Sequence, residues 1–312
     1  MVGLDLLGFI CIYLQLVGFK SMASTRGVGW GRITVSIMKS GEALEWAAQT
    51  GRSLAAFNVI TLEHAQAIVW GAETRDAPVI LQLSENAISY QGDATPLAAA
   101  MVSLAENSTA RCVLHLDHIQ DAGLARRATD WGFSSVMWDS SQLEFDQNLS
   151  ATRDMVQWAH ARGVWVEAEL GEIGGKDGAH APGVRTKPSE ARAFIEATQV
   201  DSLAVAVGSS HAMSDQSASL DLALIAEIHR AVRVPLVLHG SSGVPDEMIR
   251  HACAAGITKV NIGTALNQAA TSEVRRVLQS DAALSDPRRY LGPARDAMKE
   301  TVAHYIQVVS GT

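Results

Sequence analysis

The chain has 312 residues, of which 47% are hydrophobic and 19% charged, and its formal net charge is -8. This length accommodates one large domain or two small ones, and the apolar content is sufficient for a sizeable core. The acidic balance and the lack of a lysine- or arginine-rich block argue against a nucleic-acid-binding surface. Three scattered cysteines without a C-x-x-C pair exclude a disulfide framework and favour a reducing, cytoplasmic location.

The N-terminal segment differs from the rest of the chain. Residues 1–19 are strongly apolar but are interrupted by Asp5 and Gln15, and no positively charged stretch precedes them. A signal peptide needs that positive stretch, and a membrane span needs about 20 apolar residues without a central charge. We therefore interpret residues 1–37 as an extension that is disordered or outside the mature fold, with an anchor or signal as the alternative, and residues 38–312 as one domain.

From residue 38 onward, short apolar strands alternate with amphipathic helices. The strands are rich in Val, Leu, Ile and Ala and almost continuously apolar, which is typical of parallel strands buried on both faces. The predicted strands are 54–59, 78–83, 112–116, 134–138, 164–168, 202–207, 235–238 and 258–262. The predicted helices are 41–49, 62–75, 95–106, 123–131, 149–162, 189–198, 220–231, 245–255, 265–278 and 293–309. This alternation predicts an α/β fold, a (β/α)8 TIM barrel with an extra C-terminal helical segment.

Polar residues stand at the end of every predicted strand. Right-handed crossovers place all these ends on one face of a barrel, where polar groups indicate function. Any single one could be an ordinary loop or capping residue, but their recurrence at the same end of all eight strands favours a site. The residues are Asn58, Ser84, Asp117 with His118, Asp139, Glu169, Gly208 to His211, His239 and Asn261.

Three of these residues are histidines, His118, His211 and His239, which follow the third, sixth and seventh strands. Three neutral imidazoles with one position left for water or substrate form a catalytic zinc site. Asp117, beside the first histidine, would be its proton-transfer partner. The alternative is three ordinary core or loop histidines. His115 lies two residues before Asp117, so we expect it to point the same way and to support the site without binding metal.

Two glycine-containing turns follow the seventh and eighth strands. Gly240-Ser241-Ser242-Gly243 and Asn261-Ile262-Gly263-Thr264 each lead into a predicted helix. Backbone amides at such turns, together with the helix N-terminus, can cradle a phosphate. A third loop, residues 171–178, is long, glycine-rich and charged. Its composition favours a solvated surface loop, and a mobile lid that carries an acid or base is the alternative.

With these residues in place, the sequence resembles the class II, zinc-dependent fructose-bisphosphate and tagatose-bisphosphate aldolases over residues 38–310. The order of the matching stretches is highly specific, whereas residues 1–37 have no counterpart. The stretches are Ala56-Phe57-Asn58-Val59, Leu116-Asp117-His118, Val136-Met137-Trp138-Asp139, residues 166–171, residues 205–211, residues 235–243, Lys259-Val260-Asn261-Ile262 and residues 286–291.

The resemblance implies reversible cleavage of a ketose 1,6-bisphosphate to dihydroxyacetone phosphate and glyceraldehyde 3-phosphate, with fructose 1,6-bisphosphate favoured. It implies that the three histidines bind Zn²⁺, which polarises the ketose carbonyl, and that Asp117 takes and returns the proton of the C4 hydroxyl. It also implies a homodimer or homotetramer and a monovalent cation (Na⁺ or K⁺) near the phosphate. The expected phosphate- and substrate-binding residues are Asn58, Ser84, Gly208, Gly240, Ser242, Asn261 and Thr264.

Several positions depart from the family pattern. The lid carries Asp177 where the family usually has glutamate, and Asp177 is our candidate for the C1 proton transfer. Ala212 and Ser140 replace common glycines, and Gly263 stands where the longer fructose enzymes have aspartate, which places the chain nearer the tagatose-like subgroup. Alternatives are therefore an aldolase for tagatose bisphosphate or another phosphorylated ketose, a metal-dependent TIM-barrel hydrolase, and a non-catalytic sugar-phosphate binder.

Overall fold

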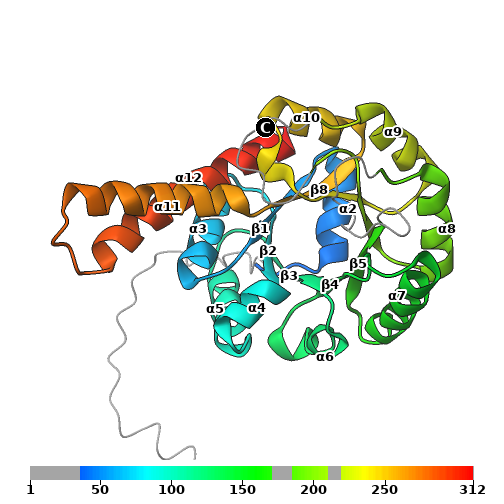
Figure 1. Cartoon of the computed structure of the whole chain (residues 1–312), viewed down its shortest axis with the longest axis horizontal. Helices are drawn as coiled ribbons and strands as arrows, with labels where there is room; N and C mark the ends of the chain where they lie inside the picture. The colour runs from blue at the N-terminus through cyan, green and yellow to red at the C-terminus, as the bar shows by residue number, and fades with distance from the viewer. Residues whose placement is uncertain (1–35, 171–184, 210–218, 312) are drawn as a thin grey trace, which may run out of the picture. The chain divides into compact units, whose positions relative to one another are not determined.

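The computed structural model describes residues 36–170, 185–209 and 219–311. Eight parallel strands form a closed barrel in sequence order, with β8 hydrogen-bonded to β1 (Figure 1). The strands are β1 Leu54–Asn58, β2 Val79–Ser84, β3 Cys112–Ile119, β4 Ser135–Trp138, β5 Trp165–Leu170, β6 Ser202–Val205, β7 Leu236–Leu238 and β8 Ile257–Ile262. The predicted TIM barrel is confirmed, and every predicted strand overlaps an observed one.

Helices surround this barrel and cover its outer face (Figure 1). They are α2 Ser40–Thr50, α3 Leu62–Glu73, α4 Glu85–Gln91, α5 Thr95–Glu106, α6 Ala122–Ala125, α7 Phe145–His160, α8 Pro188–Thr198, α9 Leu222–Ala231, α10 Asp246–Ala255, α11 Thr264–Ser280 and α12 Arg288–Ser310. α11 and α12 confirm the extra C-terminal helical segment.

One helix was not predicted, and two predicted helices needed correction. α4 was not predicted, because its seven residues are too few to show helical periodicity, although Ser84 caps it by accepting a hydrogen bond from the Ala87 N–H. The single helix predicted over residues 123–131 is instead the short α6 followed by a 3-10 turn, Thr129–Trp131. α12 begins at Arg288 and not at residue 293, because Pro293 lies inside the helix and not in its first turn. The Asp286 carboxylate accepts a hydrogen bond from the Arg288 N–H just ahead of the helix.

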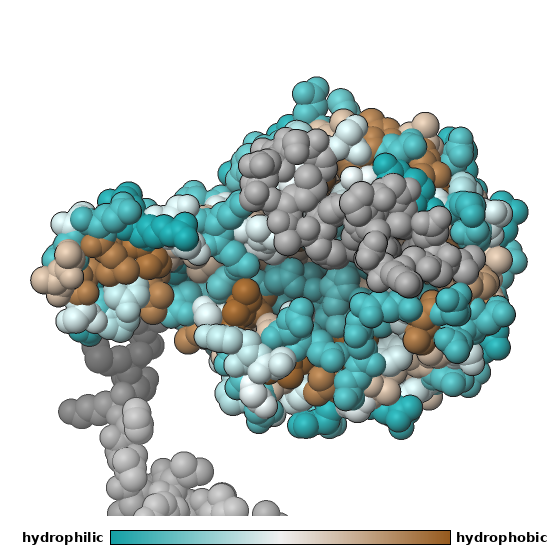
Figure 2. Space-filling view, in the orientation of Figure 1, coloured by the Kyte–Doolittle hydropathy of each residue, from teal (hydrophilic) through white to brown (hydrophobic). Residues whose placement is uncertain are grey.

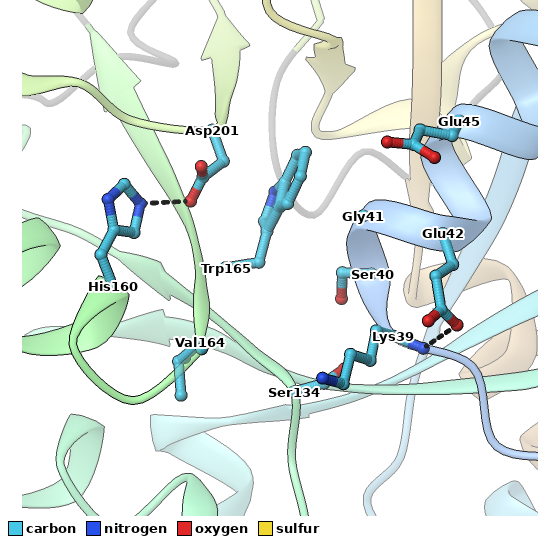
Figure 3. Close-up of a pocket in the computed structure, with 11 residues that line it drawn as sticks. Lys39, Ser40, Gly41, Glu42, Glu45, Ser134, His160, Val164, Trp165 and Asp201 are labelled. Carbon is cyan, nitrogen blue, oxygen red and sulfur yellow. Dashed lines mark hydrogen bonds and ion pairs between the residues drawn. The ribbon is translucent and has the colours of Figure 1, made fainter.

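The inside of the barrel has an apolar floor and a polar upper part. The floor consists of α2 residues packed against inward-facing strand residues at the N-terminal mouth, and it comprises Ala43, Leu44, Ala47, Leu54, Ala56, Ile80 and Val113. Beside α2, a cavity of about 420 Å³ opens between its first turn and Trp165 (Figure 3). Above the floor, buried polar side chains replace the usual aliphatic layers, and they include Gln82, His115, Ser135, Glu167 and Lys259.

The first described residues pair with β3 through Ser36 and Met38. The Ser36 carbonyl accepts a hydrogen bond from the Cys112 N–H, and the Met38 N–H donates to the Cys112 carbonyl, so this short segment runs along β3. Val35–Thr312 forms one compact unit. Across the residues that the structure describes, we find no helix with the length and apolarity needed to cross a bilayer.

Candidate metal centre and active site

The end of β3 places two consecutive side chains in the same mouth of the barrel. Neighbouring residues of a regular strand point to opposite faces of the sheet. Between Leu116 and Ile119, however, the register with β4 shifts, and His118 has a φ of 48°, in the left-handed region. This irregularity breaks the alternation, so Asp117 and His118 can both contribute to one site. Left-handed backbone at a non-glycine residue is strained, and such strain is concentrated at functional sites.

His118 and His239 come together with a carboxylate that we did not predict as a ligand, Glu169. One potential ligand atom from each of these three residues lies within 4.8 Å of the others. The two imidazole rings meet edge to face, with centroids 4.7 Å apart. His239 Nδ1 lies 3.1 Å from a Glu169 carboxylate oxygen. Two imidazoles and a carboxylate are donors that suit Zn²⁺, so the residues present fit a metal ion.

Each histidine of the cluster is oriented by a carboxylate behind it. Asp139, at the end of β4, lies 2.8 Å from His118 Nδ1, which leaves Nε2 as the ring nitrogen that can ligate a metal. Glu167, on β5, lies 3.1 Å from His239 Nε2, which leaves Nδ1 for a metal. Carboxylates that hold the distal nitrogen of a ligating histidine are typical of metal sites.

The electrostatics of the pocket favour positive charge at the histidines. Burial by itself would lower the pKa of His118, but the adjacent Asp117 carboxylate and the hydrogen bond to Asp139 outweigh it and raise this pKa to about 10. For His239 too, hydrogen bonds to Glu167 and Glu169 outweigh burial and raise the pKa. The carboxylates that stabilise a proton on each imidazole would also stabilise a metal cation bound there in place of the protons.

Asp117 is held by two amides. The Asn58 Nδ2 donates to one carboxylate oxygen at 2.7 Å, and the Asn261 Nδ2 donates to the other at 3.3 Å. Burial would raise the pKa of Asp117, yet His118, Lys259 and His239 together hold it below its usual value. The carboxylate is therefore ionised at neutral pH and can accept a proton.

The two predicted phosphate turns lie against each other. The Ser241 hydroxyl donates to the Asn261 carbonyl, and Ser242 Oγ accepts a hydrogen bond from the Ala265 N–H, 3.2 Å away, in the first turn of α11. Thr264 is the first residue of that helix. Gly240 and Gly208 have positive φ values of 65° and 120°, which glycine adopts without strain. The structure thus gathers the turns at one edge of the mouth.

The remaining predicted residues have different positions. Ser84 ends β2 opposite Asp117 in the strand register. His211 and Asp177 lie outside the described residues, as does Ala212. His115 points into the barrel as expected, but its partners are Ser135 and Lys259, and its pKa is lowered to about 3 by burial and by the Lys259 ammonium.

Glu169 was predicted at a strand end but not as a metal ligand. The signal was the alternation Glu167-Ala168-Glu169, which sends both carboxylates to one side of β5.

The fold and the cluster define the class of this protein, a TIM-barrel enzyme whose carboxyl-terminal mouth can hold a metal. The family model described as fructose-bisphosphate aldolase class-II matches residues 38–312. The chain belongs to this family, whose members are generally metal-dependent lyases.

Known proteins resemble the chain over most of its length. A fructose-bisphosphate aldolase of Staphylococcus aureus is 38% identical over 265 residues, which is 84% of this chain and 93% of that protein. The Geobacillus stearothermophilus fructose-bisphosphate aldolase is 39% identical over 272 residues, covering 86% and 95%. Among solved structures, the YdjI aldolase from Escherichia coli K12 matches with a TM-score of 0.77 at 30% identity, covering 88% and 97%.

Proposed function

We propose that this protein is a zinc-dependent ketose-bisphosphate aldolase that cleaves fructose 1,6-bisphosphate to dihydroxyacetone phosphate and glyceraldehyde 3-phosphate. The observation that carries the proposal is the convergence of His118, His239 and Glu169 beside the buried Asp117. Relatives named as fructose-bisphosphate aldolases support the substrate. His211 is proposed as a further ligand on sequence grounds.

Different residues at the mouth of the barrel would bind the metal, transfer the proton and bind the phosphate. A Zn²⁺ ion held by the histidines would polarise the ketose carbonyl as a Lewis acid. Asp117, fixed by Asn58 and Asn261, takes the proton from the C4 hydroxyl in cleavage and returns it to the aldehyde oxygen in condensation. The turns at Ser242 and Thr264 bind a phosphate through amides and hydroxyls, together with Gly208 and Gly240.

The test is retro-aldol cleavage of fructose 1,6-bisphosphate and tagatose 1,6-bisphosphate side by side, with and without a chelator. We expect chelator-sensitive release of triose phosphate, faster from the fructose epimer. Faster cleavage of the tagatose epimer would reassign the substrate. Release of inorganic phosphate without triose phosphate would indicate a hydrolase, and binding without turnover would indicate a sugar-phosphate binder.

His211 is tested separately, by replacement with alanine. If His211 is a ligand, the His211→Ala protein should lose both bound zinc and cleavage. Full activity of a metal-free His211→Ala protein would contradict the proposal that zinc is required.

We also propose that the enzyme assembles as a homodimer or homotetramer and works in the cytoplasm, within glycolysis. The assembly proposal is supported by the outer part of α11 and α12, which extends beyond the barrel and carries apolar residues at its surface (Figures 1 and 2). Leu278 on α11 is 36% exposed.

A further inference from the structure

A chain of buried polar contacts runs along the barrel interior, from the N-terminal mouth to His239. It begins at Ser40, which lines the cavity shown in Figure 3. The Ser40 hydroxyl donates a hydrogen bond to Ser135 Oγ at 2.5 Å. Ser135 Oγ lies 2.7 Å from His115 Nδ1, and His115 Nε2 lies 3.3 Å from Lys259 Nζ. The proposed aldol chemistry at the opposite mouth uses none of these four side chains.

The second half of this chain of contacts is an ion pair that reaches the metal cluster. Lys259 Nζ donates to one carboxylate oxygen of Glu167 at 2.8 Å, and the other oxygen of Glu167 lies 3.1 Å from His239 Nε2. Lys259, Glu167 and His239 are each no more than 2% exposed. Burying an ammonium and a carboxylate is costly even when they are paired, so stability alone is a weak reason for such a pair.

The Lys259 ammonium determines which ring nitrogens of His115 and His239 carry a hydrogen. An ammonium can only donate, so Lys259 requires both Glu167 and the Nε2 of His115 as acceptors. Neutral His115 then carries its hydrogen on Nδ1 and donates it to Ser135 Oγ, which accepts a second hydrogen bond from Ser40. Glu167 in turn is an obligatory acceptor, so the hydrogen of His239 lies on Nε2, and the Nδ1 side is directed toward Glu169.

From this arrangement we infer that Glu167 and Lys259 are positioning residues for the metal site. Together they fix the ring orientation and tautomer of His239, so that Nδ1 is presented to the cation. The inference rests on the proposed zinc-dependent function. Lys259 acts through Glu167, with which it forms a buried ion pair.

The experiment measures Zn²⁺ affinity by competition with a chromophoric chelator, in Glu167→Gln and in Lys259→Met. Groups that orient a ligating histidine typically contribute about 10- to 100-fold to metal affinity, and we expect losses in this range for both variants. At saturating Zn²⁺, kcat should fall while KM for fructose 1,6-bisphosphate changes by less than about threefold, because substrate contacts are intact. The absorption spectrum of the Co²⁺-loaded variants should also change, since one ligand is displaced.

A surface pair provides the matched control. Lys187 and Glu190 form an ion pair of similar length, 2.9 Å, on the outside of the barrel. The double variant Lys187→Met/Glu190→Gln removes the same two charges there, and we expect its Zn²⁺ affinity and Co²⁺ spectrum to match those of the unmodified protein.

Lys259→Met leaves the Glu167 carboxylate buried without its cation, so this variant can fail to fold. If it does not fold, the double variant Glu167→Gln/Lys259→Met, which removes both charges, is used instead of Lys259→Met. Circular dichroism checks that each variant is folded. A folded double variant that binds Zn²⁺ within about twofold of the unmodified protein would overturn the inference. If the unmodified protein binds Zn²⁺ but releases no triose phosphate, the proposed function fails, and the affinity comparison still tests the positioning role.

Discussion

At the scale of single residues, Asp117 is the proposed proton acceptor. Its carboxylate accepts hydrogen bonds from two side-chain amides, which hold it in position. We expect Asp117→Asn to lower kcat by on the order of 10²- to 10⁴-fold, which is the usual contribution of general acid–base catalysis. The new amide cannot take a proton, and it also meets the donor groups of Asn58 and Asn261.

Steady-state kinetics at saturating zinc measures the effect of this change. Bound zinc, measured by atomic absorption, should stay near the unmodified level, because the ligands are retained. Asp130→Asn is the control, since Asp130 is an exposed aspartate paired with Arg127 on the surface, and it should leave kcat unchanged. An Asp117→Asn enzyme within about threefold of normal kcat would exclude Asp117 as the essential base.

The buried thiol of Cys112 should be unreactive in the folded protein. Burial raises the pKa of its thiol from 9.0 to about 12. The thiolate is the reactive form, so in the folded protein Cys112 should not react with a disulfide reagent at pH 8. After unfolding the pKa returns to its usual value and the residue should label. Mass spectrometry of the labelled peptides before and after denaturation gives the answer, and rapid labelling of the folded protein at Cys112 would show that the start of β3 opens.

At the scale of elements, the packing of α3 against α12 depends on a glycine. A Cβ added at Gly71 would lie 2.6 Å from the Val302 Cγ1 atom and 2.9 Å from the Lys299 carbonyl oxygen. We therefore expect Gly71→Ala to lower the free energy of unfolding by roughly 1–3 kcal/mol, the usual effect of overpacking. Zinc affinity should not change, because this contact lies on the outside of the barrel.

Gly292, within α12, is the control, because outside its two chain neighbours a Cβ there meets nothing within 4 Å. Alanine gains about 0.5–1 kcal/mol of helix propensity, but the following Pro293 disfavours helical backbone at a residue with a Cβ, so we expect the free energy of unfolding of Gly292→Ala to stay within about 1 kcal/mol of the unmodified protein. Urea unfolding of both variants measures the difference. Equal effects of the same sign would mean that α12 shifts to accommodate the Gly71→Ala side chain.

The elements also show what sequence could predict. The strands could be predicted because short, nearly continuous apolar runs are typical of parallel strands buried on both faces, even where a few inward positions such as Glu167 and Lys259 are polar. The irregular end of β3 was not predictable, because the register shift at Leu116 and the left-handed His118 depend on pairing with β4. Likewise, Glu167 and Lys259 form a pair across the barrel, 92 residues apart in sequence, and no local pattern reports such a contact.

For the whole molecule, we propose that residues 1–35 are not needed for the barrel to fold. A chain that begins at Ser36 keeps the backbone contacts with Cys112. Its Tm should stay within about 2 °C of the full chain, which corresponds to about 1 kcal/mol at this size. A chain that begins at Gly41 is the control and should melt several degrees lower, because it loses those contacts and the buried Ser40. Equal loss in both truncations would show that the N-terminal residues stabilise the domain.

The surface of α11 is the interface that we propose for the homodimer. This helix has 17 residues, Leu266 is the one that is buried, and the main packing partner of α11 is α12. Figure 2 shows apolar surface on the arm that α11 and α12 form, and Leu278 of α11 is an exposed apolar residue. A second copy related by twofold symmetry would bury the same surface on both subunits. One substitution would therefore change the interface at two positions, one on each subunit.

If the protein is the proposed dimer and α11 forms its interface, Leu278→Lys should shift it to a monomer, as measured by light scattering at micromolar concentration. Loss of one buried leucine corresponds to roughly 1.5–3 kcal/mol per subunit, and hence to at least a tenfold weaker association. Gln279→Lys adds the same charge at the neighbouring exposed position and should leave the dimer intact. If the unmodified protein is monomeric, or if Leu278→Lys stays fully dimeric, the α11 surface does not form the interface, and the apolar arm requires another partner.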